Sequence, residues 1–286
     1  MRIGIDLYSF IPGKNFGVGP TNYAYSLVNH LLKMNTGHFF VLFTNKDNED
    51  FFKDGPNCKV IRSQMPPSKG LLRVVHEQLI LPLCFYKEKL DLIHFTGNVI
   101  SFGLFKNSVF TVHDQMWKFY RQSDWVPFYK KFYYSILCPI SIRLAQRIIV
   151  MSQFVKDELL NDYRIAADKI FVIPPAQYVP DLVLSEERTT ELKREFGEGY
   201  LFTVTTTWPH KNLITLLKAY VLLTKALGFD RKLIIIGQNR LRNKEIDRFM
   251  EDHPGLGGQI RFLGYVPDEV VKYLYAHASV FIFPSL

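Results

Sequence analysis

Three absences narrow the class of this 286-residue chain before any motif is considered. Its three cysteines, Cys58, Cys84 and Cys138, lie far apart and form no CxxC or Cys/His pair, which argues against a disulfide framework or a zinc centre. No run of 18 uncharged apolar residues occurs, so no transmembrane helix is predicted. The strand-like Arg2–Asp6 stands where a signal peptide would carry a basic segment and an apolar core. We therefore expect a cytoplasmic protein with reduced cysteines.

Further absences bear on ligands. No Asp-x-Asp and no His/Cys ligand cluster is present, so we expect no metal and no cofactor. The segment Gly17-Val18-Gly19 would need a third glycine at Asn22 to make a dinucleotide fingerprint. Thr44-Asn45 stand where an oxidoreductase of that type carries an acidic residue, so that class is disfavoured. No nucleic-acid-binding motif accompanies the basic charge, so we expect no nucleic-acid partner.

The composition is that of a folded, basic protein. Hydrophobic residues make up 48% and charged residues 22%, and the formal net charge is +8. A positive balance suits an anionic partner such as a nucleotide phosphate, an anionic membrane surface or nucleic acid. It is equally compatible with a basic protein that has no such partner.

Short apolar runs alternate with helical-period segments, which is typical of a parallel sheet covered by helices. In the first part, strands are predicted at Ile3–Leu7, Phe39–Thr44, Lys59–Arg62, Leu92–Phe95, Ser108–Val112, Arg147–Met151 and Ile170–Ile173. Helices are predicted at Thr21–Met34 after a loop over 12–20, at Leu72–Leu90, at Trp125–Cys138 with a continuation to Arg147, and at Gln153–Asp162.

A second set of units follows a proline-rich stretch and a charged entry helix at Ser185–Arg194. Its predicted strands are Tyr200–Thr205, Leu233–Gly237, Gln259–Leu263 and Val280–Phe283, and its helices are Asn212–Leu227, Asn243–Asp252 and Pro267–Ala276. No helix follows the last strand, so we expect the second domain to be incomplete. The predicted domains are 1–178, a linker with entry helix at 179–198, and 199–286.

Two candidate sites fall in the first domain. Gly17 and Gly19 precede the first helix, where glycine lets the backbone approach an anion at the helix start; the alternative is a simple turn. His113 follows a strand directly, so it is expected at the carboxyl edge of the sheet, where it could contact a sugar hydroxyl or a developing charge. The alternative is a surface histidine satisfied by Asp114.

Two more candidates fall in the second domain. Thr205 and Thr206 end a strand, and Lys211 follows at the predicted start of a helix, where its charge is unfavourable unless an anion is bound. This pattern indicates a diphosphate site; the alternative is a solvated lysine. The turn Gly264-Tyr265-Val266 could flank a nucleobase, or it could be a tight connection to a helix capped by Asp268.

Taken in order, these motifs resemble the family-4-type (group 1) glycosyltransferases of the GT-B fold. The resemblance rests on Gly17–Tyr23, Leu92–Phe95, Val112–Asp114, Val150–Phe154, Lys169–Pro175, Pro209–Asn212, Phe262–Val266 and Phe281–Ser285. The chain departs from the family at Pro20, Thr206 and His210, where arginine is common, and at Thr205, where glycine is usual. The family's Glu-containing loop and Glu-x7-Glu helix, which follow the last strand, are not in this sequence.

The resemblance implies an α/β fold of two tandem Rossmann-like parallel-sheet domains, the second incomplete. It implies a mannosyltransferase-like enzyme that moves a sugar from a nucleotide diphosphate sugar to a hydroxyl acceptor, with retention and without metal, in surface polysaccharide or glycolipid synthesis. The second domain would bind the donor through Thr205, Thr206, Lys211, Gly264, Tyr265 and Val266, with Gly17 and Gly19 beside it. The first domain would bind a saccharide or lipid-linked acceptor, with His113 as a hydrogen-bond donor to the donor sugar. The alternative is a catalytically dead fragment or a nucleotide-sugar-binding module.

Aromatic and basic residues alternate within 117–147. The aromatic residues are Trp117, Phe119, Tyr120, Trp125, Phe128, Tyr129, Phe132, Tyr133 and Tyr134, and the basic ones are Lys118, Arg121, Lys130 and Lys131. This mixture favours peripheral binding to the anionic inner face of a membrane. Stacking on acceptor sugars and a core helix with a solvated basic face are the alternatives.

Overall fold

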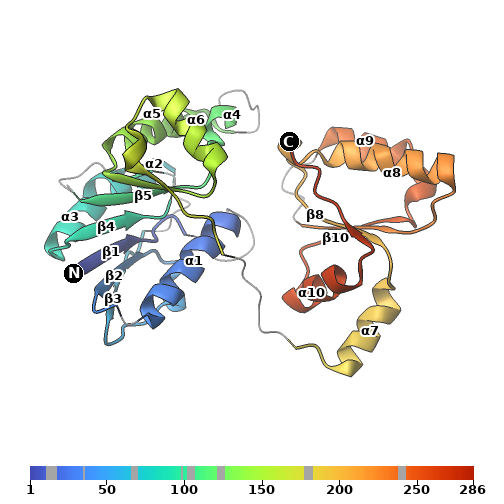
Figure 1. Cartoon of the computed structure of the whole chain (residues 1–286), viewed down its shortest axis with the longest axis horizontal. Coiled ribbons are helices and arrows are strands. Elements are labelled where there is room, and N and C mark those ends of the chain that lie inside the picture. Colours follow the sequence, from blue (N-terminus) through green and yellow to red (C-terminus); the bar gives the residue numbers. More distant parts are fainter. Residues whose placement is uncertain are drawn as a thin grey trace. The chain divides into compact units, whose positions relative to one another are not determined.

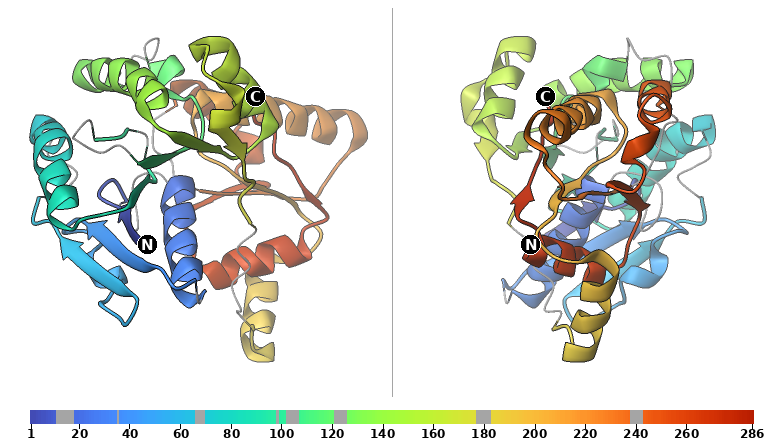
Figure 2. Two further views of the ribbon diagram at one scale, coloured as in Figure 1. Left: turned by 60° about the vertical axis from the view of Figure 1, so that its left-hand side comes forward. Right: turned by 90° about the vertical axis from the view of Figure 1, so that its right-hand side faces the viewer.

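The structure is a computed structural model that describes residues 1–10, 18–34, 36–65, 70–97, 99–101, 107–120, 126–176, 183–237 and 243–286. The chain divides into two compact units, Met1–Tyr178 and Val179–Leu286 (Figure 1). Each unit is a parallel sheet with helices on both faces (Figure 2). The predicted α/β class with two parallel-sheet domains is therefore confirmed.

The first unit is built on a seven-stranded sheet in the order β3-β2-β1-β4-β5-β6-β7, and its strand pairs are parallel. The strands are β1 (Arg2–Asp6), β2 (Phe39–Thr44), β3 (Cys58–Arg62), β4 (Leu92–Phe95), β5 (Ser108–Val112), β6 (Arg147–Val150) and β7 (Ile170–Val172). The chain order reverses between β1 and β4. Ligands of open parallel sheets bind beside such a switch point, at the carboxyl ends of the strands.

Helices cover both faces of this sheet because its strands present apolar side chains on both faces. The helices are α1 (Val18–Lys33), α2 (Gly70–Val75), α3 (Leu81–Lys87), α4 (Trp117–Tyr120), α5 (Phe128–Leu144) and α6 (Gln153–Tyr163). One core joins α1 to β1, β2 and β3 through residues such as Val28 and Phe40. The other joins α3, α5 and α6 to the sheet through residues such as Phe85 and Leu159. Short 3₁₀ turns lie at Glu49–Phe51 and Ala167–Lys169.

The second unit has a four-stranded parallel sheet in the order β10-β9-β8-β11. Its strands are β8 (Leu201–Val204), β9 (Leu233–Ile236), β10 (Ile260–Gly264) and β11 (Val280–Phe281), and its helices are α7 (Glu186–Phe196), α8 (Leu213–Leu227), α9 (Lys244–Glu251) and α10 (Asp268–His277). The helices α8 and α9 pack on one face, and α7 and α10 on the other (Figure 1). Single 3₁₀ turns lie at Pro209–Lys211 and Pro254–Leu256.

Two helical segments of the first unit differ from the prediction in ways that their prolines explain. The first helix begins at Val18, not at Thr21, because a proline is tolerated in a first turn, where the backbone N–H groups have no helical partner; Pro20 therefore does not end the loop. The segment predicted as one helix from Leu72 to Leu90 contains a π-helical stretch at His76–Ile80. Pro82 lies just after this stretch and lacks the N–H that a continuous α-helix would use, which explains why the helix widens there.

A buried polar network joins the π-helical stretch to its neighbours in the first unit. Glu77 accepts a hydrogen bond from Arg73 Nε at 2.7 Å and another from the Tyr133 hydroxyl of α5. His76 lies 2.8 Å from Ser63 Oγ through its Nε2. The contact between Arg73 and Glu77 pairs two opposite charges in the interior, as buried ionic groups require.

The same network reaches the end of β1. His76 stacks on the ring of Tyr8, with ring centroids 4.6 Å apart. Asp6 is 8% exposed, and its Oδ1 accepts the Tyr8 N–H at 2.9 Å. Burial, and then the nearby charge of Glu77, raise the pKa of the Asp6 carboxyl to about 7 despite the Tyr8 hydrogen bond and Arg73. The folded protein therefore holds a proton on Asp6 in a pH range where the unfolded chain has released it.

This linkage predicts that Asp6→Asn stabilises the protein at high pH. The folded pKa is raised, so the stability that the proton contributes is complete below about pH 4 and is lost as the pH rises towards 7. Asparagine keeps an oxygen for the Tyr8 N–H and cannot ionise. We expect Asp6→Asn to gain up to about 4 kcal/mol over the wild type at pH 8 and close to nothing at pH 4, measured by urea unfolding.

The control is Asp168→Asn, which removes an exposed carboxyl of the same unit. It should leave the difference between the two pH values close to that of the wild type. An Asp6→Asn variant that differs from the wild type equally at pH 4 and pH 8 would contradict the buried proton.

Candidate functional site

The carboxyl edge of the second sheet is shaped by one very close contact. Gly237 follows β9 with φ +123°, and a Cβ at this position would lie 1.9 Å from the carbonyl oxygen of Thr205. Its N–H donates to the Gly264 carbonyl at 2.8 Å, and Gly264 itself has φ +68°. Only glycine fits at Gly237. Gly237 was predicted only as the end of a strand, and not as part of the site.

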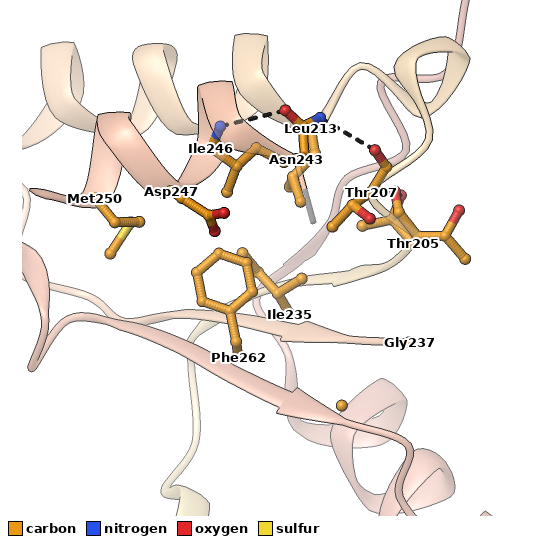
Figure 3. A pocket seen from close by; sticks show the side chains of 12 residues that line it. Thr205, Thr207, Leu213, Ile235, Gly237, Asn243, Ile246, Asp247, Met250 and Phe262 are labelled. Carbon is orange, nitrogen blue, oxygen red and sulfur yellow. Dashed lines mark hydrogen bonds between the residues drawn. The ribbon is translucent and has the colours of Figure 1, made fainter. Parts of the chain in front are cut away.

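A cavity of about 210 Å³ opens at this edge (Figure 3). It is lined by Thr205, Thr206, Thr207, Leu213, Ile235, Gly237, Asn243, Ile246, Asp247, Met250, Phe262 and Gly264. Three of these, Thr205, Thr206 and Gly264, were predicted from the sequence, and the structure brings them together around one cavity. The hydroxyls lie towards β8, and the apolar side chains come from β9, β10, α8 and α9 (Figure 3).

Asn243 holds the far wall of the cavity in place, and sequence reasoning missed it. Its Oδ1 accepts the N–H groups of Glu245 and Ile246, so it caps α9. Its Nδ2 donates to the Thr207 carbonyl at 3.1 Å (Figure 3). The start of α9 is thereby tied to the loop after β8. An asparagine before a helical run is the signal from which its capping role could have been read.

Lys211 lies outside the residues that line the cavity, beyond the loop that follows β8. Its Nζ stands 5.0 Å from the centre of the Phe283 ring, a cation–π contact. Lys211 was predicted at the start of the helix Asn212–Leu227, and it lies two residues before the observed helix α8. Lys211 ends the 3₁₀ turn Pro209–Lys211, and Asn212 then adopts a left-handed conformation with φ 53° before α8 begins. The left-handed Asn212 therefore separates Lys211 from the first turn of α8.

The segment after β11 fixes this turn. The His210 carbonyl accepts the Leu286 N–H at 2.9 Å and the Ser285 hydroxyl at 3.1 Å. Asn212 Nδ2 donates to the Pro284 carbonyl at 3.2 Å. The two motifs Pro209–Asn212 and Phe281–Ser285 thus pack together at the switch point between β8 and β11, where the strand order reverses.

Tyr265 and Val266, also predicted for donor binding, are not among the described residues that line the cavity. Tyr265 is 73% exposed, and Val266 packs against the core between the sheet and the helices α7 and α10. Gly17 lies outside the described residues. Gly19 falls in the first turn of α1, and a Cβ there would meet nothing within 4 Å, so the surroundings do not demand glycine.

In the first unit, His113 lies at the carboxyl end of β5 as predicted. Its Nε2 is 3.0 Å from the Thr96 carbonyl oxygen, and the Tyr23 ring meets it edge-on at 5.0 Å. His94 on β4 is buried next to it and contacts Thr111 Oγ1 at 2.7 Å. Burial, and then the proximity of His113, lower the pKa of His94 to about 4, so His94 is neutral near pH 7.

This geometry corrects the predicted role of His113 as a hydrogen-bond donor to the sugar. A carbonyl oxygen can only accept, so Nε2 carries the hydrogen that binds Thr96. Burial lowers the pKa of His113, against the opposing effects of the Thr96 hydrogen bond and Asp114, so the neutral ring dominates at neutral pH. In that ring Nδ1 has no hydrogen, and it would accept a hydrogen bond from a ligand hydroxyl.

Within the described residues, no group of three or more His, Cys, Asp or Glu side chains is placed to hold a metal ion. No helix in the described part of the chain is both long and apolar enough to cross a bilayer.

The chain is similar to enzymes of bacterial O-antigen synthesis. Over 148 residues it is 31% identical to O-antigen chain mannosyltransferase B of Escherichia coli, covering 51% of this chain and 39% of that protein. Over 189 residues it is 26% identical to O-antigen chain mannosyltransferase RfbU of Salmonella typhimurium, covering 64% and 47%. The chain thus spans less than half the length of these two relatives.

A solved structure shares the fold. Anabaena HepE in complex with UDP-glucose matches with a TM-score of 0.64 and 17% identity, over 100% of this chain and 74% of that one. At this identity the match speaks for the fold alone.

Family models cover both units. Residues 18–176 match the model described as Glycosyltransferase Family 4, and residues 186–286 match the one described as Glycosyl transferases group 1. The first match alone spans more than half of the chain. On the fold, the motifs and these matches, the chain belongs to the group 1, family-4-type glycosyltransferases of the GT-B fold.

Proposed function

We propose that this protein transfers a sugar from a nucleotide diphosphate sugar to a hydroxyl acceptor in the synthesis of a surface polysaccharide. The observation that carries the proposal is the cavity at the carboxyl edge of β8, β9 and β10, with three threonines on its β8 side and Lys211 in the adjoining turn. Hydroxyl donors beside a lysine suit a diphosphate. The names of the O-antigen relatives support the polysaccharide part of the proposal.

The catalytic task is to stabilise the negative charge that develops on the departing diphosphate. We assign this to Lys211, whose ammonium would supply the charge that a metal ion supplies elsewhere, and to the hydroxyls of Thr205 and Thr206. Metal independence is therefore part of the proposal, and so is retention of the anomeric configuration, which rests on family membership. The turn that carries Lys211 is held by the Ser285 and Leu286 hydrogen bonds, so the charge is positioned before the ligand arrives.

His113 is proposed to bind a hydroxyl of the donor sugar through Nδ1. Its ring is fixed by the Thr96 carbonyl on one side and by the Tyr23 ring on the other. A ring held in this way orients a hydroxyl at little entropic cost. The acceptor is proposed to bind the first unit.

The diphosphate assignment predicts a specific loss on Lys211→Ala. Removing a charge-assisted contact costs about 1.5 to 3 kcal/mol, so the affinity for a nucleoside diphosphate should fall about tenfold or more. Isothermal titration calorimetry on the whole chain measures it, and turnover with a sugar donor should fall by a similar factor.

Lys232→Ala is the matched control for this test. Lys232 is exposed and immediately precedes β9, at the opposite edge of the same sheet. It should bind the nucleotide as the wild type does. Equal affinities for Lys211→Ala and the wild type would remove Lys211 from the site.

A second proposal is peripheral binding to an anionic membrane surface. Phe128, Phe132 and Ile136 recur at helical spacing on α5 and are 82%, 61% and 39% exposed. The segment from α2 to α3 exposes Leu79, Leu83 and other apolar residues. These side chains suit insertion at a bilayer interface.

Three residues of the aromatic and basic segment make contacts within the fold and are left out of the proposed membrane surface. Trp117 is buried and donates its Nε1–H to the Tyr163 hydroxyl, and Lys118 pairs with Asp162 and Glu158, so these two residues serve the fold. Tyr133 is held by Glu77. Trp125 and Arg121 lie outside the described residues.

Membrane binding predicts that the chain co-sediments with phosphatidylglycerol vesicles and not with phosphatidylcholine vesicles. The double change Phe128→Ser and Phe132→Ser should lower the bound fraction several-fold, because the aromatic side chains that enter the interface are lost. Phe154→Ser is the control, since Phe154 is 70% exposed on α6. A wild-type chain that stays in the supernatant with anionic vesicles would refute the proposal.

A further inference from the structure

Among the described residues that line the cavity of the second unit, Asp247 has the single charged side chain. Asp247 of α9 points its carboxylate into the space between Ile246 and Phe262 (Figure 3). Across the described part of the chain, no hydrogen bond or salt bridge engages this carboxylate. Its backbone N–H donates to the Asn243 carbonyl at 3.0 Å, so the carboxylate sits on a capped, tethered helix.

The surroundings of Asp247 suit a flat, partly apolar group. Phe262 is 46% exposed and offers a ring at the cavity, with Met250 and Ile235 beside it. At about 210 Å³ the cavity is smaller than the roughly 300 to 1,000 Å³ of pockets that enclose a whole small ligand. It therefore has room for one moiety of a nucleotide sugar, and an aromatic ring on its wall favours the base.

The position of the cavity relative to Lys211 fits the length of a nucleotide. The strand order β10-β9-β8-β11 puts Phe262 two strands away from the strand that leads to Lys211. Strands lie about 4.8 Å apart, so β8 and β10 are separated by about 10 Å. A nucleoside diphosphate laid along the edge would place its phosphates at the β8–β11 switch point and its base at β10.

An ionised carboxylate only accepts hydrogen bonds, and two adjacent donors satisfy it best. Guanine presents such a pair, the N1–H and the 2-amino group. Uracil offers one N–H between two carbonyl oxygens, and adenine and cytosine offer an amino group beside an acceptor nitrogen. Each of these three bases would direct an acceptor at the carboxylate.

Building on the proposed function, we infer that Asp247 selects a guanine nucleotide and that the donor is a GDP-sugar. The carboxylate accepts the guanine N1–H and 2-amino hydrogens, and the ring packs against Phe262. Asn243 cannot take this role, because its amide is engaged by Thr207 and by the first turn of α9.

The test is calorimetric titration of the whole chain with GDP, UDP, ADP and xanthosine diphosphate. The wild type should bind GDP at least tenfold more tightly than the other three. Asp247→Asn should lose at least tenfold for GDP and gain for xanthosine diphosphate. An amide offers one acceptor and one donor, and xanthine presents the complementary N1–H and 2-carbonyl. A change that merely disturbed the fold would lower all four affinities together.

Glu251→Gln, one turn further along α9 and not lining the cavity, is the matched control and should keep the wild-type preference for GDP. Equal affinities of the wild type for GDP and UDP, with Lys211→Ala still weakening both, would overturn the role of Asp247 and leave the proposed function standing. A preference for GDP that Asp247→Asn leaves intact would do the same. No binding of any nucleoside diphosphate would overturn both.

Discussion

Gly237 and the Thr205 carbonyl approach more closely than any side chain on Gly237 would permit, and the shape of the second unit's carboxyl edge depends on that contact. The absence of a Cβ lets the chain leaving β9 turn against the end of β8, and the Gly237 N–H then reaches the Gly264 carbonyl of β10. Three strand ends are thereby locked together. The cavity is the space that this arrangement leaves beneath α9, and Asn243 holds the helix above it.

The two ends of this edge differ in chemistry because different local structures form them. At β8 and β11 the backbone turns are tight and polar, and the segment 284–286 fixes the turn that carries Lys211 through the His210 carbonyl and the Asn212 amide. At β10 the bulge between Phe262 and Gly264 leaves an aromatic ring partly exposed next to a carboxylate. A cationic end and an acidic, aromatic end suit the two ends of a nucleoside diphosphate. Beside the switch point of the first unit, burial likewise disfavours charge: it raises the pKa of Asp6 to about 7 and lowers the pKa of His94 to about 4.

The sequence was a good guide wherever local pattern decides the structure. The strands Phe39–Thr44, Leu92–Phe95 and Ser108–Val112 were predicted with their observed bounds, because each is an apolar run bounded by polar or turn residues. Prediction failed where distant contacts decide. Asn212 is left-handed, and its amide binds the Pro284 carbonyl far along the chain, so the 3₁₀ turn that ends at Lys211 was not predicted. The close approach at Gly237 and the tether of Asn243 are likewise tertiary contacts that no local pattern contains. His113 was placed correctly, but the direction of its hydrogen bond required the Thr96 carbonyl to be located.

The central claim is that a nucleoside diphosphate binds along the carboxyl edge of the second sheet. A crystal structure of the chain with GDP tests it most directly. The account predicts a phosphate oxygen within hydrogen-bond distance of Lys211 Nζ and the hydroxyls that end β8, with the base in the cavity against Phe262. A nucleotide bound elsewhere on the chain, or one that leaves both Lys211 and the cavity without contact, would contradict it.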